Sequence, residues 1–337
     1  MKYINKVVVS GIALALATAS CADLDTKYEG GYVTAGQKQT SLENKAELAS
    51  ASVTGGFNAF FTCLTHWSNH KDFGYPSVMI GLDLQTEDYI TKNSGYNHYN
   101  VYEAYAGGSD SSYPAAMLWT YQYEQIKVCN DILTTITPEL AENNNELKFY
   151  RAQALALRSY DYWTLAQVYA FNYDGYADAP CVPILTEENA TDVALNGCAR
   201  ATVAETYVQI MKDINGAIEL LDNNPVKPSD VIDTQSKRLV SKAVAYGLRA
   251  RYYLSMHKYT EAAQDAQSAI AAFEGRPYSV EEVGAPGFTT MSDPSWMWGV
   301  AISETQDGIA DGSIVNFPSM TCSFVHGYTD QGGVWKW

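Results

Sequence analysis

Tyrosines recur at every third position in the stretch GYNHYNVYEAYAGG, which covers residues 95–108. Exposed aromatic planes beside amide groups suit a ligand that has apolar faces and polar edges. Residues three apart lie on one face of a helix. The stripe would consist of Tyr96, Tyr99, Tyr102 and Tyr105, with Asn97 and Asn100 beside it. We interpret it as a candidate binding surface; the alternative is the buried face of a short helix.

A second aromatic candidate is PSWMWG, residues 294–299. If this stretch is a strand, its alternation places Trp296 and Trp298 on the same face. That face is either buried against neighbouring helices or open to a ligand. Trp67 and Tyr75 are weaker binding candidates, since they lie in a stretch that several glycines interrupt.

Two stretches contain residue types that bind metals. HWSNH places His66 and His70 four residues apart, the spacing of a helical metal pair, but no glutamate adjoins the first histidine as it does in zinc hydrolases. DLQTED offers Asp83, Glu87 and Asp88, either as a calcium site or as a solvated acidic loop. We favour the plain interpretation of both stretches and expect no metal site.

The sequence contains no combination of residues that indicates catalysis. It has no G-x-S-x-G motif, no phosphate-binding loop and no dinucleotide fingerprint. The acids of DLQTED all lie on one segment, whereas a catalytic carboxylate pair needs residues on facing elements. We therefore expect a binding protein with no catalytic residues and no cofactor, rather than an enzyme.

The charge of the chain argues against one class of partner. Lys and Arg number 22 against 38 Asp and Glu, a formal net charge of −16. Binding to phosphate backbones depends on contacts from Lys and Arg. We expect no nucleic-acid partner.

The N-terminus has the layout of a secretion signal. Lys2 and Lys6 precede the apolar run VVVSGIALALA, which is shorter than the roughly 20 residues that span a bilayer as a helix. A basic start, an apolar middle and small residues before the cleavage site are typical of a signal peptide. Cys21 directly follows Thr-Ala-Ser, which resembles a bacterial lipobox. We expect residues 1–20 to be a lipoprotein signal peptide and Cys21 to carry the lipid; the alternative is an ordinary signal peptide with an incidental cysteine.

Helix signals dominate the rest of the chain and must position these candidates. Caps, prolines and apolar patterning predict helices over residues 42–64, 111–137, 145–170, 202–221 and 240–273, the last a pair of helices. Gly55 and Gly56 should weaken the first, and Asn145 should cap the third. We expect a tether over residues 21–40, a helical region over 41–275 and the start of an irregular subdomain over 276–337.

The last helix pair has the residue spacing of a tetratricopeptide repeat. The positions that match are Tyr246, Ala250, Tyr253, Tyr259 and Ala262. We interpret all five as core residues rather than a site. His257 stands where the repeat often has glycine.

Four stretches together resemble the SusD/RagB family, the glycan-binding surface lipoproteins of Bacteroidetes. They are SCADLD, YEQIKVCNDIL, FYRAQALALRSYDYWTLAQVYA, which contains the Arg151-Ala152 pair, and KAVAYGLRARYYLSMHKYTEAAQDAQSAI, which contains Leu248 to Arg251. The turn DGYADAPCVP departs from the usual Gly-Asp/Val-Pro form of the family. Members are usually longer, so we expect a further C-terminal portion in the natural protein.

The resemblance implies a mainly α fold, in which tetratricopeptide-like hairpins form a right-handed scaffold with an irregular, loop-rich subdomain. It implies capture of oligosaccharide or polysaccharide at the cell surface and delivery to a SusC-like TonB-dependent transporter. The protein would be anchored to the outer membrane through its lipid. The alternative function is a tetratricopeptide scaffold that binds a peptide or another non-sugar cargo.

The cysteines do not form a disulfide framework. Beyond Cys21 there are five, an odd number, and their spacings match no zinc pattern. Cys181 and Cys198 are the one pair that we consider for a bridge.

Overall fold

A computed structural model describes residues 33–58, 79, 81–87, 113–231, 236–284 and 292–299. The chain divides into two compact units, residues 1–38 and residues 39–337, and the arrangement below is that of the second unit. The described elements are α2 (Ala35–Asn44), η1 (Ala46–Leu48), α3 (Ala49–Asn58), α6 (Tyr113–Thr135), α7 (Pro138–Ala141), α8 (Asn145–Tyr169), β1 (Pro180–Pro183), α9 (Ala190–Asn196), β2 (Arg200–Thr202), α10 (Val203–Asp222), α11 (Pro228–Val231), η3 (Ser236–Arg238), α12 (Lys242–Ser255), α13 (Tyr259–Ala272) and α14 (Val280–Val283).

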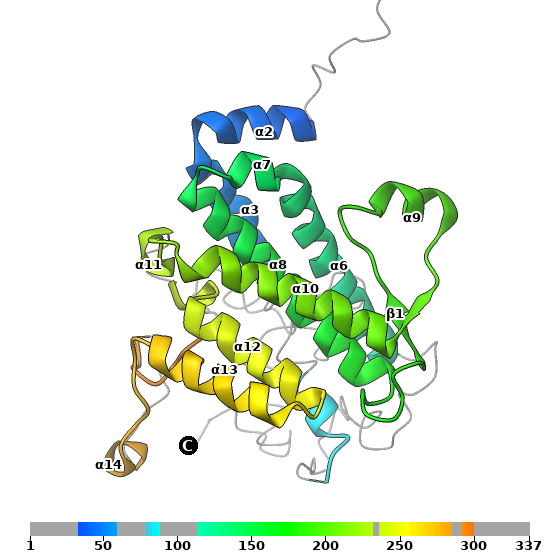
Figure 1. The fold of residues 1–337 in the computed structure, drawn as a ribbon, viewed down its shortest axis with the longest axis vertical. Helices are drawn as coiled ribbons and strands as arrows, with labels where there is room; N and C mark the ends of the chain where they lie inside the picture. The colour runs from blue at the N-terminus through cyan, green and yellow to red at the C-terminus, as the bar shows by residue number, and fades with distance from the viewer. Residues whose placement is uncertain are drawn as a thin grey trace, which may run out of the picture. The chain divides into compact units, whose positions relative to one another are not determined.

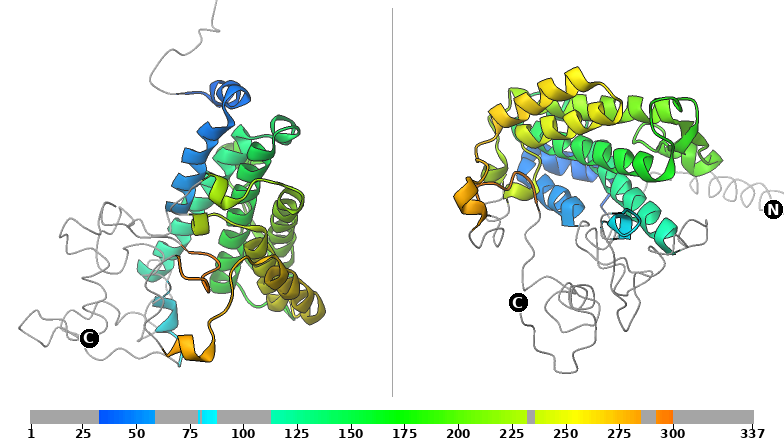
Figure 2. Two further views of the ribbon diagram at one scale, coloured as in Figure 1. Left: turned by 90° about the vertical axis from the view of Figure 1, so that its left-hand side faces the viewer. Right: turned by 90° about the horizontal axis from the view of Figure 1, so that it is seen from below.

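Helices pack side by side in the order of the sequence. α6 packs on α8, α8 on α10, α10 on α12, and α12 on α13 (Figure 1, Figure 2). Two of these pairs, α6–α8 and α12–α13, are hairpins with short connections. The prediction of a mainly α fold is confirmed. None of the helices in the described ranges is both long enough and apolar enough to cross a membrane.

The central helix is α8, and its N-cap lies one residue before the predicted one. The side-chain oxygen of Asn144 accepts hydrogen bonds of 3.0 Å from the backbone N–H groups of Glu146 and Leu147. Most residues from Leu147 to Ala166 are buried. A helix that is buried all round belongs to the core, so α8 is the element on which α6 and α10 pack.

Capping also fixes the start of α10, close to the predicted position. The Thr202 hydroxyl accepts from the backbone N–H of Glu205 at 3.1 Å, while the Glu205 carboxylate accepts from the backbone N–H of Thr202 at 2.8 Å. This reciprocal arrangement is a capping box. The same hydrogen bond from the Thr202 backbone lowers the pKa of the Glu205 carboxyl.

The helix predicted over residues 42–64 is wrong as a continuous element. Lys45 is extended, with φ −147° and ψ 86°, and separates α2 from η1 and α3. The predicted weak point instead lies inside α3. A Cβ on Gly56 would lie only 3.3 Å from Cγ1 of Val128, so the glycine permits the close approach of α3 to α6.

A buried ion-pair cluster joins three of the packed elements. Arg158 of α8 donates to both carboxylate oxygens of Asp213 on α10, at 2.8 and 2.7 Å, and to Asn130 of α6 at 2.7 Å. It also donates to Glu187 in the loop after β1. Burial alone would lower the pKa of Arg158, but the bonds and charges of Asp213 and Glu187 raise it. The guanidinium therefore remains charged and crosslinks α6, α8 and α10.

The repeat-like residues of α12 and α13 are not uniformly core. Ala262 is buried, and Tyr246 and Tyr253 are partly buried, with the Arg249 guanidinium 5.3 and 5.9 Å from their ring centroids. Tyr259 is 62% exposed, so its prediction as core is wrong. It is the first residue of α13, and its ring turns back onto the connecting turn rather than into the groove between the helices.

The bridge considered between Cys181 and Cys198 is absent, and both cysteines are free. β1 and β2 pair antiparallel, with Pro180 opposite Thr202 and Pro183 opposite Arg200. This register leaves Cys198 before β2 begins, where it is exposed, while Cys181 is buried.

Candidate functional site

The segment of residues 292–299 docks against two distant parts of the chain. The backbone N–H of Gly299 donates to the carbonyl of Lys237 at 3.1 Å, and the N–H of Arg276 donates to the carbonyl of Pro294 at 3.0 Å. The ammonium of Lys237 donates to the carbonyl of Asp293. The segment consists of turns and bends rather than the predicted strand, because these contacts pair it with η3 and with the stretch after α13, and not with another strand.

Glycine is required where this segment crosses the end of α13. A Cβ on Gly275 would collide with the carbonyl oxygen of Pro294 and with the Phe273 ring. The backbone at this position therefore lies directly against residues 292–299. This crossing closes one side of the cavity described next.

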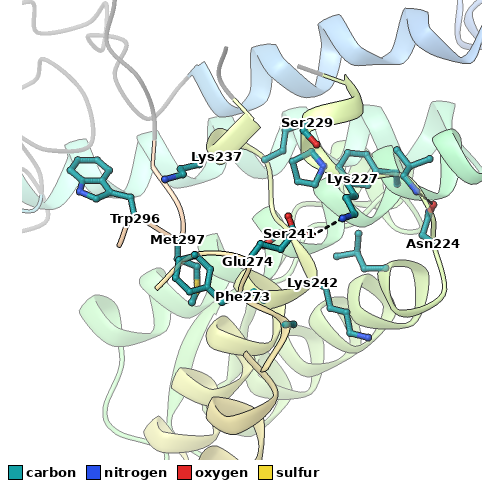
Figure 3. Close-up of a pocket in the computed structure, with 18 of the residues that line it drawn as sticks. Asn224, Lys227, Ser229, Lys237, Ser241, Lys242, Phe273, Glu274, Trp296 and Met297 are labelled. Atoms are coloured by element: carbon teal, nitrogen blue, oxygen red, sulfur yellow. Dashed lines mark hydrogen bonds and ion pairs between the residues drawn. The ribbon is translucent and has the colours of Figure 1, made fainter. Parts of the chain in front are cut away.

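A cavity of about 630 Å³ lies where the end of α10, the start of α12 and the segment after α13 meet. Trp296 lies at one end and Asn224 at the other, with Phe273 and Met297 between them (Figure 3). The apolar part of the lining also contains Phe149, Leu221, Val226, Pro228, Leu239 and Pro294. An aromatic and aliphatic lining with a few polar groups is typical of a small-molecule site.

Four of the five charged residues that line the cavity form two ion pairs. The ammonium of Lys227 lies 2.6 Å from a carboxylate oxygen of Glu274, and that of Lys242 lies 2.8 Å from Asp222. The hydrogen bonds to these carboxylates raise the pKa of both lysines, so both stay protonated. The fifth charged residue, Lys237, donates to the backbone carbonyl of Asp293. The lining therefore combines two ion pairs with one further ammonium and several uncharged polar groups.

Trp296 and Trp298 have different environments although they are two residues apart. The Trp298 indole N–H donates to the carbonyl of Arg238 at 2.8 Å. Its ring packs edge-on against Phe57 and Tyr160, with centroids 6.5 and 5.6 Å apart. Trp298 therefore holds the segment to the core, and Trp296 is the tryptophan that lines the cavity.

The indole nitrogen of Trp296 is an unused donor. It is buried, and no residue in the described part of the chain accepts its N–H. A buried donor without an acceptor costs about 1–3 kcal/mol. A ligand oxygen that reached this N–H would remove that cost.

Most of the other predicted site residues lie outside the described residues. These are Tyr96, Asn97, Tyr99, Asn100, Tyr102, Trp67 and Tyr75, together with the lipidation candidate Cys21 and the histidines His66 and His70. Asp83 and Glu87 are described, and both side chains are exposed. Within the described ranges, no group of three or more His, Cys, Asp or Glu residues could hold a metal ion.

Sequence reasoning did not identify the rest of the cavity lining. Asn224, Lys227, Phe273 and Glu274 lie in connections on either side of α12 and α13. They meet only because the helices bring the ends of distant connections together. No spacing in the sequence relates them to Trp296.

The chain is similar to known proteins of one family. A SusD-like family model, described as "Starch-binding associating with outer membrane", matches residues 75–254. A SusD-like carbohydrate binding protein from Bacteroides vulgatus is 26% identical, with a TM-score of 0.66 over 77% of this chain and 51% of its own. No curated protein matches the chain.

Two further solved structures share the fold at lower identity. A SusD superfamily protein from Bacteroides fragilis is 24% identical, with a TM-score of 0.51 over 69% of this chain and 50% of its own. A SusD homolog from Bacteroides thetaiotaomicron is 17% identical, with a TM-score of 0.52 over 73% of this chain and 44% of its own. The chain thus spans about half the length of the structures that it matches. Because the family model matches more than half of the sequence, the chain belongs to the SusD-like family.

Proposed function

We propose that the protein captures oligosaccharides at the cell surface and delivers them to a SusC-like TonB-dependent transporter of the outer membrane. It binds its ligand without catalysis. Membership of the SusD-like family carries this proposal, together with the name of the Bacteroides vulgatus relative, a carbohydrate binding protein.

The cavity at Trp296 supports an oligosaccharide as the ligand. Its lining combines an indole with the amide of Asn224 and the hydroxyls of Ser229 and Ser241. Aromatic faces suit the C–H patches of a sugar ring, and the amide and hydroxyl groups suit its hydroxyls. We propose that Trp296 contributes to binding and that the tyrosine stripe over residues 96–102 provides a further contact surface.

Native affinity electrophoresis across a panel of polysaccharides tests the proposal. We expect at least one polysaccharide to retard the protein and Trp296→Ala to weaken that retardation. Trp296→Phe keeps an aromatic face but removes the N–H, so it separates stacking from hydrogen bonding. Leu195→Ala, an exposed apolar residue on α9, serves as the control. No retardation by any polysaccharide would contradict the proposal, and so would release of sugar products by the purified protein.

The anchor and the transporter need separate experiments. We propose that Cys21 is lipidated and attaches the chain to the outer membrane. Cys21→Ala should release the protein from the membrane fraction. Co-purification of a TonB-dependent transporter with the full-length, membrane-anchored protein tests the partner. Unchanged fractionation of Cys21→Ala would contradict the anchor while leaving glycan binding intact.

A further inference from the structure

Two stacked aromatic pairs meet on a surface that the cavity does not include. Phe171 and Tyr176, in the loop after α8, stack with centroids 4.8 Å apart and planes 23° apart. His257 and Tyr259, at the turn between α12 and α13, stack with centroids 5.7 Å apart and planes 11° apart. We call these four residues the aromatic platform. Phe171, Tyr176 and Tyr259 are 64%, 50% and 62% exposed.

A polar contact joins the two pairs. Nδ1 of His257 lies 3.3 Å from a carboxylate oxygen of Asp174, so the loop after α8 lies against the turn between α12 and α13 (Figure 1). Asp174 is two residues from Tyr176 and three from Phe171. At about 3.3–3.6 Å per residue, neither Cα lies more than about 11 Å from that of Asp174. A short oligosaccharide can span both pairs.

The loop that presents Phe171 and Tyr176 is held in place. Tyr173 packs edge-on against Tyr207 of α10, with centroids 5.0 Å apart. The backbone N–H of Ala204 donates to the carbonyl of Ala177 at 2.8 Å. A surface that is already ordered loses little conformational entropy on binding.

His257 occupies a backbone position that favours glycine. Its φ is +57°, and among the described residues it is the one non-glycine with positive φ. The Lys258 N–H donates to the Tyr253 carbonyl at 2.9 Å, the pattern of a helix C-terminus that usually ends in glycine. In this conformation the imidazole stacks on Tyr259 and contacts Asp174. A strained residue at an exposed turn that makes these contacts indicates a site rather than a packing requirement.

The chemistry of the platform favours a neutral sugar over the alternatives. At about 200 Å² per aromatic side chain, the three exposed rings offer roughly 350 Å², well below the roughly 800 Å² that each partner buries in a stable protein interface. Asn172, Asp174 and Asp178, in the same loop as Phe171 and Tyr176, are exposed. Lys258, between His257 and Tyr259, is exposed as well. The two carboxylates outnumber this ammonium, so they disfavour phosphates and anionic lipids, and they accept hydrogen bonds from sugar hydroxyls.

From this geometry we propose that Phe171, Tyr176, His257 and Tyr259 form a second oligosaccharide-binding site. The inference rests on the proposed function, because it assigns the same ligand class to a different surface. The two sites are separable, since no residue of the platform lines the cavity at Trp296.

Native affinity electrophoresis with the polysaccharide that retards the wild-type chain tests the inference. Phe171→Ala and Tyr259→Ala should each weaken retardation roughly two- to tenfold, the factor to which an aromatic contact of about 0.5–1.5 kcal/mol converts. Leu195→Ala, which removes a still more exposed apolar side chain elsewhere, should have no effect. Hydrogen exchange should show protection of residues 171–178 when the matching oligosaccharide is added.

His257→Gly distinguishes a site from a structural turn. Glycine suits the positive φ, so the variant should unfold at no lower temperature than the wild type, yet bind the polysaccharide more weakly. If a polysaccharide retards the wild type and the platform variants equally, the second site is overturned and the proposed function stands. Loss of transporter co-purification with unchanged glycan binding would also overturn it, and would make the platform a protein interface. No retardation of the wild type by any polysaccharide would overturn both proposals.

Discussion

Replacing Arg158 with methionine tests whether the buried ion-pair cluster holds α6, α8 and α10 together. The side chains of Arg158 and Asp213 are only 2% and 1% exposed. In the variant, Asp213 keeps the hydrogen bond of 2.9 Å from the Gln209 amide but loses both bonds from the guanidinium. Methionine fills most of the volume, so the main loss is electrostatic.

The expected loss is large for a single substitution. Removing one partner of a buried ion pair costs about 3–5 kcal/mol, because the other charge stays buried without compensation. We therefore expect Arg158→Met to lower the free energy of unfolding by about 3–5 kcal/mol. Lys212→Met, which breaks the exposed pair with Glu188, should lower it by less than about 1 kcal/mol. Urea denaturation followed by circular dichroism measures both.

A double variant separates the cost of the unpaired charge from the value of the pair. Replacing both buried partners with apolar residues is often close to neutral. Arg158→Met combined with Asp213→Leu should therefore recover most of the stability that Arg158→Met loses. A loss of unfolding free energy below about 1 kcal/mol for Arg158→Met would refute this reasoning, because ion pairs that contribute so little are typically exposed to solvent. If the double variant is no more stable than Arg158→Met, the loss of stability comes from altered packing and not from the unpaired charge of Asp213.

Three further predictions concern stability and its dependence on pH. Arg158 lowers the pKa of Glu187 despite its burial, so this pair's stabilisation should be lost as pH falls below the ordinary glutamate value of 4.5, and Arg158→Met should flatten that loss in urea titrations across pH. Burial raises the pKa of Asp161, whose oxygens have no partner among the described residues. Stability should therefore decline as pH rises through that pKa, and Asp161→Asn should raise the free energy of unfolding at about pH 8 by roughly 1 kcal/mol; an unchanged value would mean that the carboxyl has a partner in solution. Gly275→Ala should cost about 1–3 kcal/mol and shift the tryptophan emission of the protein to longer wavelength as residues 292–299, which include Trp296 and Trp298, detach; a wild-type spectrum would contradict the close crossing.

Helix ends were predictable where a side chain caps the backbone locally. The helix predicted from Thr202 begins there, with the Thr202–Glu205 capping box formed. From the sequence, Thr137 and Pro138 indicate only the end of the preceding helix, but Thr137 also caps α7, a short helix that is not among the predicted ones. The break at Lys45 was not predictable, because no glycine or proline marks it. The Gly55-Gly56 pair predicted a weak point, but α3 continues through both glycines. Glycine in a helix can permit close packing as well as a break.

The candidate site was less predictable than the fold, for a reason that Trp296 and Trp298 illustrate. Residue alternation assigns both to one face. The indole N–H of Trp298 donates to the carbonyl of Arg238, whereas Trp296 lines the cavity. The acceptor lies 60 residues away along the chain, so no local pattern could assign the two roles.

His257 shows a different kind of failure, one that is informative. The repeat pattern predicts glycine at this turn and a core tyrosine two residues later, and the chain has an exposed His257–Tyr259 stack instead. Where local propensity and structure disagree without a gain in packing, function is the usual reason. Here the strain at positive φ is offset by the contact with Asp174 across to another loop. The departure from the repeat pattern is visible in the sequence alone, but its meaning depends on the loop that folding brings beside it.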